Sequence, residues 1–278
     1  MARPTCLYCG EPLPGGEALA APPPPEPPPA AGDRALLVLD LRGADERVVA
    51  EALGLSPFDA RQRVSAGGYQ LHRALPQERA DEESERLARA GLAVRVVPAA
   101  EAAARGRPLA VRGGGDGDGL VLKTEEGPLR LGPGDLFLVV RGPITREYQT
   151  NPEVKRVRTA TLEGGHRIHL HRASDPRPLE VDPLAFDFAD AVLPSLSSLL
   201  TILDWLERAA PGTPIDDGFR RLTPALAPAR AEVSGRLGAA EALRTPRGAS
   251  SVGPLVLDNV EQFRAYSAWR AAIELRRA

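Results

Sequence analysis

The chain has 278 residues, 43% of them hydrophobic, and a net charge of -2 at pH 7. This length exceeds that of one small domain and the apolar content suffices for buried cores, so we expect two or three domains. The balanced charge argues against a general attraction to nucleic acid or to an anionic membrane. Only Lys123 and Lys155 among the 35 basic residues are lysines, a skew typical of a GC-rich genome, so arginine richness alone does not indicate phosphate binding.

Both cysteines of the chain, Cys6 and Cys9, stand near the N-terminus in a C-x-x-C pair followed by Gly10. This pair resembles one knuckle of a zinc ribbon, in which two thiolates bind a tetrahedral Zn²⁺. The second knuckle is missing from the sequence. We therefore expect a structural zinc whose remaining ligands come from a second copy of the chain, giving a homodimer, or from histidines. An unmetallated knuckle and a redox dithiol are the alternatives.

A proline-rich stretch from Pro22 to Pro29 follows the cysteines and predicts an extended spacer. Residues 1–33 are thus expected to be a zinc-knuckle-like tail with its linker. No apolar signal region stands before Cys6, and no apolar stretch is long enough to span a bilayer. We expect a cytoplasmic protein without a transmembrane segment, in keeping with the lack of a disulfide framework.

Residues 34–105 carry alternating strand and helix signals and are predicted to form a small βααβαβ domain that folds by itself. The expected elements are strands over 35–41, 69–75 and 92–97, and helices over 45–53, 56–66 and 76–90. The second helix has the clearest start, because Ser56, Pro57 and Asp59 form a capping box with proline at the first helical position.

The same segment resembles the C-terminal domain of the bacterial ribosomal stalk protein. The matching residues are Leu53-Gly54-Leu55, Asp59-Ala60-Arg61, Val64, the acidic run Glu82 to Leu87, and Ala90-Gly91. In that family a helical pair recruits protein partners through basic side chains. The resemblance implies the βααβαβ fold and a protein-docking face, with Arg61 at a basic position and Phe58 in place of a lysine. Phe58 is expected to be exposed beside Arg61 and to anchor a partner.

The rest of the chain predicts a second architecture. Residues 106–210 contain short alternating runs separated by glycine, proline and aspartate, which indicate an antiparallel β-rich module followed by an amphipathic capping helix. This pattern is similar to that of a pleckstrin-homology-type barrel. Residues 211–278 are predicted to be a helical C-terminal region whose last helix has one apolar stripe. The predicted fold class is therefore α+β, with several domains.

His169 and His171 form an H-x-H pair on a predicted strand, where alternate side chains share one face. Such a pair can chelate a metal ion, and it is the second candidate, after the cysteines, for zinc ligands. The alternative is a solvated basic face, since arginines flank the pair. The stretch from Arg141 to Arg172 has seven basic residues against three acids, which would suit an acidic partner, a phosphoinositide or nucleic acid. The alternative is an arginine-rich face that reflects only the GC-rich genome.

Catalytic motifs are missing from the sequence, and Asp216 and Asp217 are expected to be solvated or capping acids. We therefore predict a non-enzymatic interaction or regulatory protein with a protein partner. The first alternative is a regulator that binds a small ligand or lipid through the β-rich module. The second is a metal-dependent enzyme that uses His169 and His171.

Overall fold

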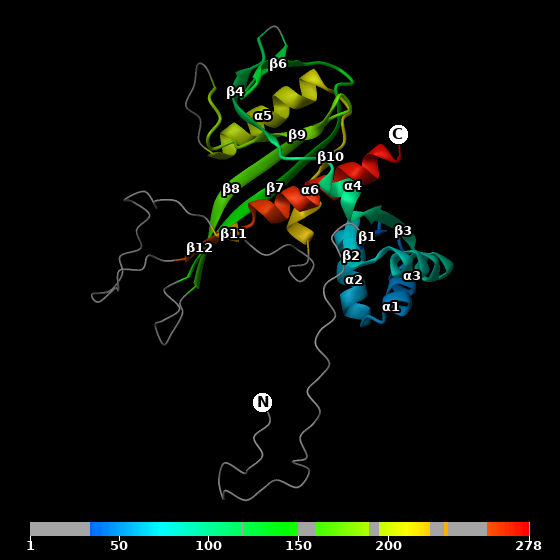
Figure 1. The fold of residues 1–278 in the computed structure, drawn as a ribbon. Helices are drawn as coiled ribbons and strands as arrows, with labels where there is room; N and C mark the ends of the chain where they lie inside the picture. Colours follow the sequence, from blue (N-terminus) through cyan, green and yellow to red (C-terminus); the bar gives the residue numbers. More distant parts are fainter. Residues whose placement is uncertain are drawn as a thin grey trace, which may run out of the picture. The chain divides into compact units, whose positions relative to one another are not determined.

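The computed structural model describes residues 34–117, 119–149, 159–188, 195–222, 231–232 and 255–277. All described residues belong to one compact unit, Ala31–Ala278 (Figure 1). The predicted tail with Cys6 and Cys9 lies outside the described residues. Helices and strands are both abundant, which confirms the predicted α+β class.

The first part of the described chain has the predicted βααβαβ order. Its elements are β1 (Arg34–Asp40), α1 (Glu46–Leu53), α2 (Pro57–Ala66), β2 (Tyr69–Pro76), α3 (Gln77–Arg89) and β3 (Ala93–Pro98). The three strands form an antiparallel sheet in the order β2-β1-β3. Because the first strand lies in the centre, its neighbours cover both of its edges.

Local sequence signals explain where α1 and α2 begin and end. The Asp45 side chain accepts hydrogen bonds from the backbone amides of Arg47 and Val48, and Gly54 ends that helix in the left-handed conformation, with φ of 62°. The Ser56 hydroxyl oxygen accepts a hydrogen bond from the amide of Asp59, 3.1 Å away, as the predicted capping box requires. The helical pair is therefore fixed by short-range chemistry.

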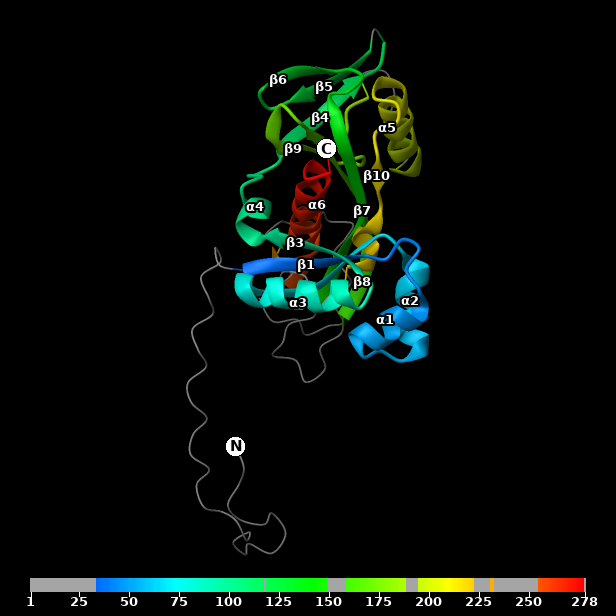
Figure 2. The same ribbon diagram turned by 90° about the vertical axis from the view of Figure 1, so that its right-hand side faces the viewer.

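The small sheet is buried on both faces. Leu37, Leu39 and Leu41 pack with side chains of α1, α2 and α3, which cover one face (Figure 2). The other face presents Val38, Tyr69, Leu71 and Val97, which pack with residues of the C-terminal half of the chain. The predicted autonomous domain thus has an apolar face that its own helices do not cover.

After α4 (Ala99–Ala103) the chain builds a nine-stranded sheet. Its strands are β4 (Leu109–Gly115), β5 (Leu120–Thr124), β6 (Gly127–Leu131), β7 (Leu136–Gln149), β8 (Thr159–Arg172), β9 (Asp175–Val181), β10 (Ile215–Asp216), β11 (Ala231–Glu232) and β12 (Leu255–Asp258). The sequence predicted an antiparallel module, but β4 pairs with β9, and β10 with β7, in parallel. The paired parallel strands are far apart in sequence, so no turn motif between them predicts the pairing.

Successive side chains of the long strands β7 and β8 point to opposite faces of this sheet. Helix α5 (Ser195–Ala209) covers one face and helix α6 (Val260–Leu275) covers the other. Val139 and Leu170 pack with α5, whereas Leu138 and Val140 pack with α6. A strand turns successive side chains to opposite faces, so one register fixes both contacts. The 3₁₀ helix η2 (Gly218–Arg221) adds Phe219 on the α6 side.

Helix α6 is buried on most of its circumference because it packs against both sheets (Figure 2). The sequence predicted a single apolar stripe on this helix. The structure also buries Ser267, Arg270, Ala271 and Ala272. A helix enclosed on several sides has no wide solvated face, so its amphipathic pattern is weak.

None of the described helices is long and apolar enough to cross a membrane.

Replacing Trp269 by alanine should destabilise the protein by about 3–5 kcal/mol, because the indole is buried between the sheets and its loss leaves a cavity. Urea unfolding of the full chain measures this loss. Leu275→Ala is the matched control, since Leu275 ends the same helix with 42% of its surface exposed and should cost far less. Equal losses in the two variants would contradict the packing described for α6.

Candidate functional site

Helix α2 carries an exposed aromatic side chain beside an exposed arginine. Phe58 is 68% exposed, and the Arg61 side chain is 74% exposed. The two residues are three positions apart, so they are neighbours on the helix surface. Among the described residues, Arg61 forms an ion pair with Glu46 alone, with Nε and Oε1 3.9 Å apart, a weak exposed pair. The exposure of Phe58 is as the sequence predicted.

A cavity of about 330 Å³ lies against the same helix, lined by other residues than Phe58 and Arg61. Its wall contains four residues of α2 together with Leu55, Gln70 and Arg221; the α2 residues are Asp59, Gln62, Arg63 and Ala66. The four α2 positions follow helical spacing and form one stripe. Sequence reasoning found the helix but missed Arg221, which η2 brings to the cavity from 155 residues beyond Ala66.

Arg221 is held by contacts to both parts of the fold. Its Nη1 donates a hydrogen bond to the carbonyl oxygen of Ala66 at 2.8 Å, which is one of the terminal carbonyls of α2. Its Nη2 lies 3.7 Å from Oδ1 of Asp217, the residue directly before η2. Arg221 therefore links the end of α2 to η2 at the wall of the cavity.

The two candidate metal-binding histidines lie side by side, as the H-x-H spacing predicted, but they face the protein interior. His169 and His171 are each 1% exposed, so the alternative of a solvated basic face is wrong. The hydroxyl of Ser267, on α6, lies 2.8 Å from Nδ1 of His169 and 2.7 Å from Nε2 of His171. One hydroxyl group therefore joins the two rings.

The chain of hydrogen bonds continues to Glu180 on β9. Nε2 of His169 lies 3.0 Å from Oε2 of Glu180, and Arg264 of α6 holds the same carboxylate through Nε and Nη2 at 2.8 and 2.7 Å. Burial alone would raise the pKa of Glu180, but the hydrogen bonds from His169 and Arg264 lower it well below its usual range. Glu180 is therefore ionised and can only accept hydrogen bonds.

This ionisation sets the proton positions along the chain. Burial lowers the pKa of His169 and of His171, so both rings are neutral near pH 7. His169 donates from Nε2 to Glu180, and its Nδ1 then accepts the proton of the Ser267 hydroxyl. His171 must consequently donate from Nε2 to the Ser267 oxygen. Hydrogen bonds therefore run in one direction from His171 through Ser267 and His169 to Glu180, and each of the three donors has a single acceptor.

The Ser267–His169–Glu180 arrangement has the order of a hydrolase triad. Ser267 is 0% exposed, however, so its hydroxyl cannot meet a substrate in this conformation. The arrangement therefore supports a structural role, namely fixing α6 to β8 and β9.

The described residues contain no cluster of three or more histidine, cysteine, aspartate or glutamate side chains that could hold a metal ion. A zinc site that joins His169 and His171 to Cys6 and Cys9 is untested, because both cysteines lie outside the described residues. It stays a prediction from the sequence.

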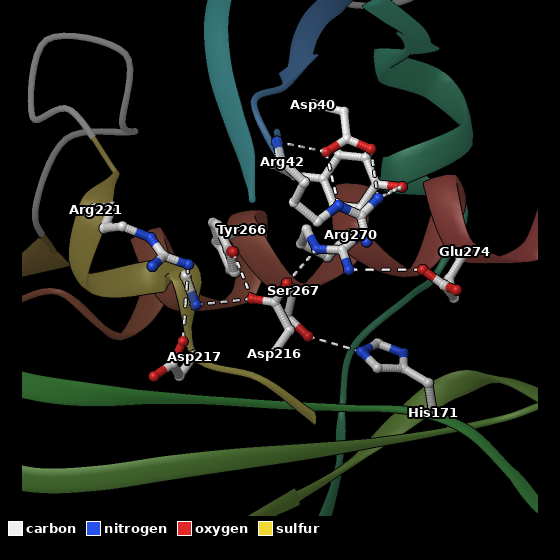
Figure 3. Close-up of polar contacts among 12 residues, drawn as sticks. Asp40, Arg42, His171, Asp216, Asp217, Arg221, Tyr266, Ser267, Arg270 and Glu274 are labelled. Carbon is white, nitrogen blue, oxygen red and sulfur yellow. Dashed lines mark hydrogen bonds and ion pairs between the residues drawn. The ribbon is translucent and has the colours of Figure 1, made fainter. Parts of the chain in front are cut away.

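A second polar cluster surrounds Asp216, which the sequence predicted to be a solvated or capping acid. Asp216 is not solvated: its side chain is only 14% exposed and lies between Tyr266 and Arg270 of α6 (Figure 3). It does cap, because its Oδ1 accepts a hydrogen bond from the backbone amide of Gly218, the first residue of η2, at 2.9 Å. Its carboxylate accepts hydrogen bonds from the Tyr266 hydroxyl at 2.6 Å and from Arg270 Nε at 2.7 Å. Arg270 also lies over the ring of Tyr69, 4.3 Å from its centroid, and thereby links α6 to the small sheet.

Comparisons with protein-family models, with curated proteins and with solved structures found no match to this chain. The resemblances to a zinc ribbon, to the stalk-protein domain and to a pleckstrin-homology-type barrel therefore remain predictions from the sequence. So do the domain boundaries expected after residues 33, 105 and 210.

Replacing Ser267 by alanine removes the hydroxyl that joins His169 and His171, and leaves two buried ring nitrogens without this partner. A buried polar group without a hydrogen bond costs about 1–3 kcal/mol, so urea unfolding should show a loss in this range or above it. Ser197→Ala, at an exposed position of α5, is the control and should change stability little. A stable Ser267→Ala protein would show that the hydrogen-bond chain adds nothing to the fold.

Proposed function

We propose that this protein is a non-enzymatic interaction protein that binds a partner protein through α2. One observation supports this most directly: Phe58 is largely exposed beside Arg61, on a helix whose ends are fixed by capping and by Arg221. Aromatic and arginine side chains are the residues that most often anchor protein interfaces. An exposed aromatic side chain on a rigid helix offers a partner apolar contact area, and binding then does not carry the entropic cost of ordering a loop.

The cytoplasm is the compartment that we propose for this interaction. The two cysteines without a disulfide framework support a reducing environment.

A second candidate function is the binding of a small ligand by the β-rich module. A cavity of about 500 Å³ lies between the β5–β6 region and the end of α5. Leu131, Pro133, Arg208 and Ala209 are among its lining residues, so it combines apolar walls with charged groups. Its volume is in the range usual for small-molecule sites. This cavity does not include Phe58 or Arg61, so the two functions predict different effects of mutation.

Phe58→Ala should abolish capture of the protein partner by the immobilised full chain, while the melting temperature stays nearly unchanged, because the ring is exposed and packs little within the fold. Leu196→Ala is the control, since Leu196 is similarly exposed, at 66%, but lies on α5. Undiminished capture by Phe58→Ala would exclude α2 as the docking helix. A sharp drop in melting temperature would instead show that Phe58 is needed for folding.

We further propose a structural zinc ion bound by Cys6 and Cys9 as thiolates. Their spacing supports this, because C-x-x-C allows both sulfurs to reach one tetrahedral ion. Protein purified in reducing buffer should contain zinc by elemental analysis, and Cys6→Ser together with Cys9→Ser should remove it. About one ion per chain would indicate that other residues of the same chain complete the site, and about half an ion would indicate a homodimer. A metal-free wild-type protein would refute the site.

A further inference from the structure

The proposed docking surface on α2 is continuous with the neighbouring cavity. Gln62 follows Phe58 by four positions, so the two side chains are neighbours on the helix surface. Gln62 also lines the cavity with Asp59, Arg63 and Ala66. A partner segment that contacts Phe58 and runs along α2 toward its C-terminus therefore reaches the cavity without leaving the helix.

Two arginines, Arg63 and Arg221, line the far end of this surface. Nε of Arg221 is buried and makes no hydrogen bond in the described structure. The guanidinium group of Arg63 makes no hydrogen bond or ion pair with any described residue, although Arg63 lines the cavity. Guanidinium donors prefer carboxylate oxygens, to which they form strong charge-assisted hydrogen bonds.

From this arrangement we infer that the partner is recognised through an acidic segment, whose carboxylate enters the cavity between Arg63 and Arg221 while an apolar side chain of the same segment packs on Phe58. This inference rests on the proposed docking function of α2. It adds the chemistry of the partner, and it adds Arg221 of η2 to the binding site.

The helix also fixes the spacing of the two anchors. From Phe58 to Ala66, whose carbonyl oxygen accepts a hydrogen bond from Arg221, α2 rises about 12 Å. An extended peptide covers this distance with three to four residues, at about 3.3 Å per residue. The partner segment should thus carry its acidic residue about three or four positions from its apolar one.

Asp59 and Asp217 are the acids close to this cavity, and both have partners. The Asp59 carboxylate accepts a hydrogen bond from the hydroxyl of Ser56 at 2.7 Å. Asp217 pairs with Arg220 at 3.0 Å and lies farther, at 3.7 Å, from Arg221. Asp59 lines the cavity and repels a carboxylate, so Asp59→Asn should strengthen binding of an acidic segment, whereas Arg63→Gln should weaken it.

The test uses the full-length chain labelled with ¹⁵N and three synthetic peptides. The first peptide has a leucine followed, three residues later, by a pair of glutamates; its twins carry glutamines or lysines instead. The acidic peptide should shift the NMR signals of the Phe58 amide and of the Arg63 and Arg221 side-chain Nε groups. The glutamine twin should bind at least about tenfold more weakly, and the lysine twin should not bind, because each lacks a charge-assisted bond to the arginines.

Arg63→Glu reverses the charge at this position. This variant should bind the lysine peptide more tightly than the acidic peptide. Arg79→Glu, at an exposed position of α3, is the matched control and should keep the wild-type preference. Arg63→Gln repeats the test with a neutral side chain. Equal binding of the acidic peptide and its glutamine twin, no shift at Arg63 and Arg221, or the same effect of Arg63→Glu and Arg79→Glu would each overturn the inference.

The two proposals can fail separately. If a protein partner is lost on Phe58→Ala but retained on Arg63→Glu, docking through α2 stands and the acidic recognition is refuted. If Phe58→Ala retains the partner, the docking function itself is refuted.

Discussion

Helix α6 is packed between the small sheet and the nine-stranded sheet, and the other contacts in the described fold depend on this placement. Its apolar residues, including Phe263, Tyr266 and Trp269, fill one core with residues from both sheets. A helix in this position buries its polar side chains as well, so each of them needs a partner inside the protein. Glu180 and Asp216 supply these partners for Arg264 and Arg270.

The polar groups around α6 make its position specific. The Ser267 hydroxyl meets both histidines, so a rotation or shift of α6 would move it away from both rings. Apolar packing alone tolerates small shifts of a helix, whereas a buried hydrogen-bond chain loses partners when the helix moves. The histidine pair thus serves the fold, while the surface on α2 stays accessible for binding.

The same placement of α6 positions the proposed binding surface. Tyr266 and Arg270 hold Asp216, and the turn after Asp216 leads directly into η2, which carries Arg221 to the end of α2. The cavity beside Phe58 is therefore formed by two segments that are distant in sequence. Its charge and shape belong to the assembled fold, although Phe58 itself stands on a helix defined by local signals.

The sequence by itself determined the α+β class, the βααβαβ order, the ends of α1 and α2, and the shared face of His169 and His171. These features follow from capping, glycine stops and side-chain periodicity, which act over a few residues. Only the tertiary structure decided that the histidines are buried, that Asp216 binds Arg270, and that Arg221 lines the cavity. Each of those contacts joins residues far apart in the chain, and no local spacing encodes which distant side chain completes a buried hydrogen bond.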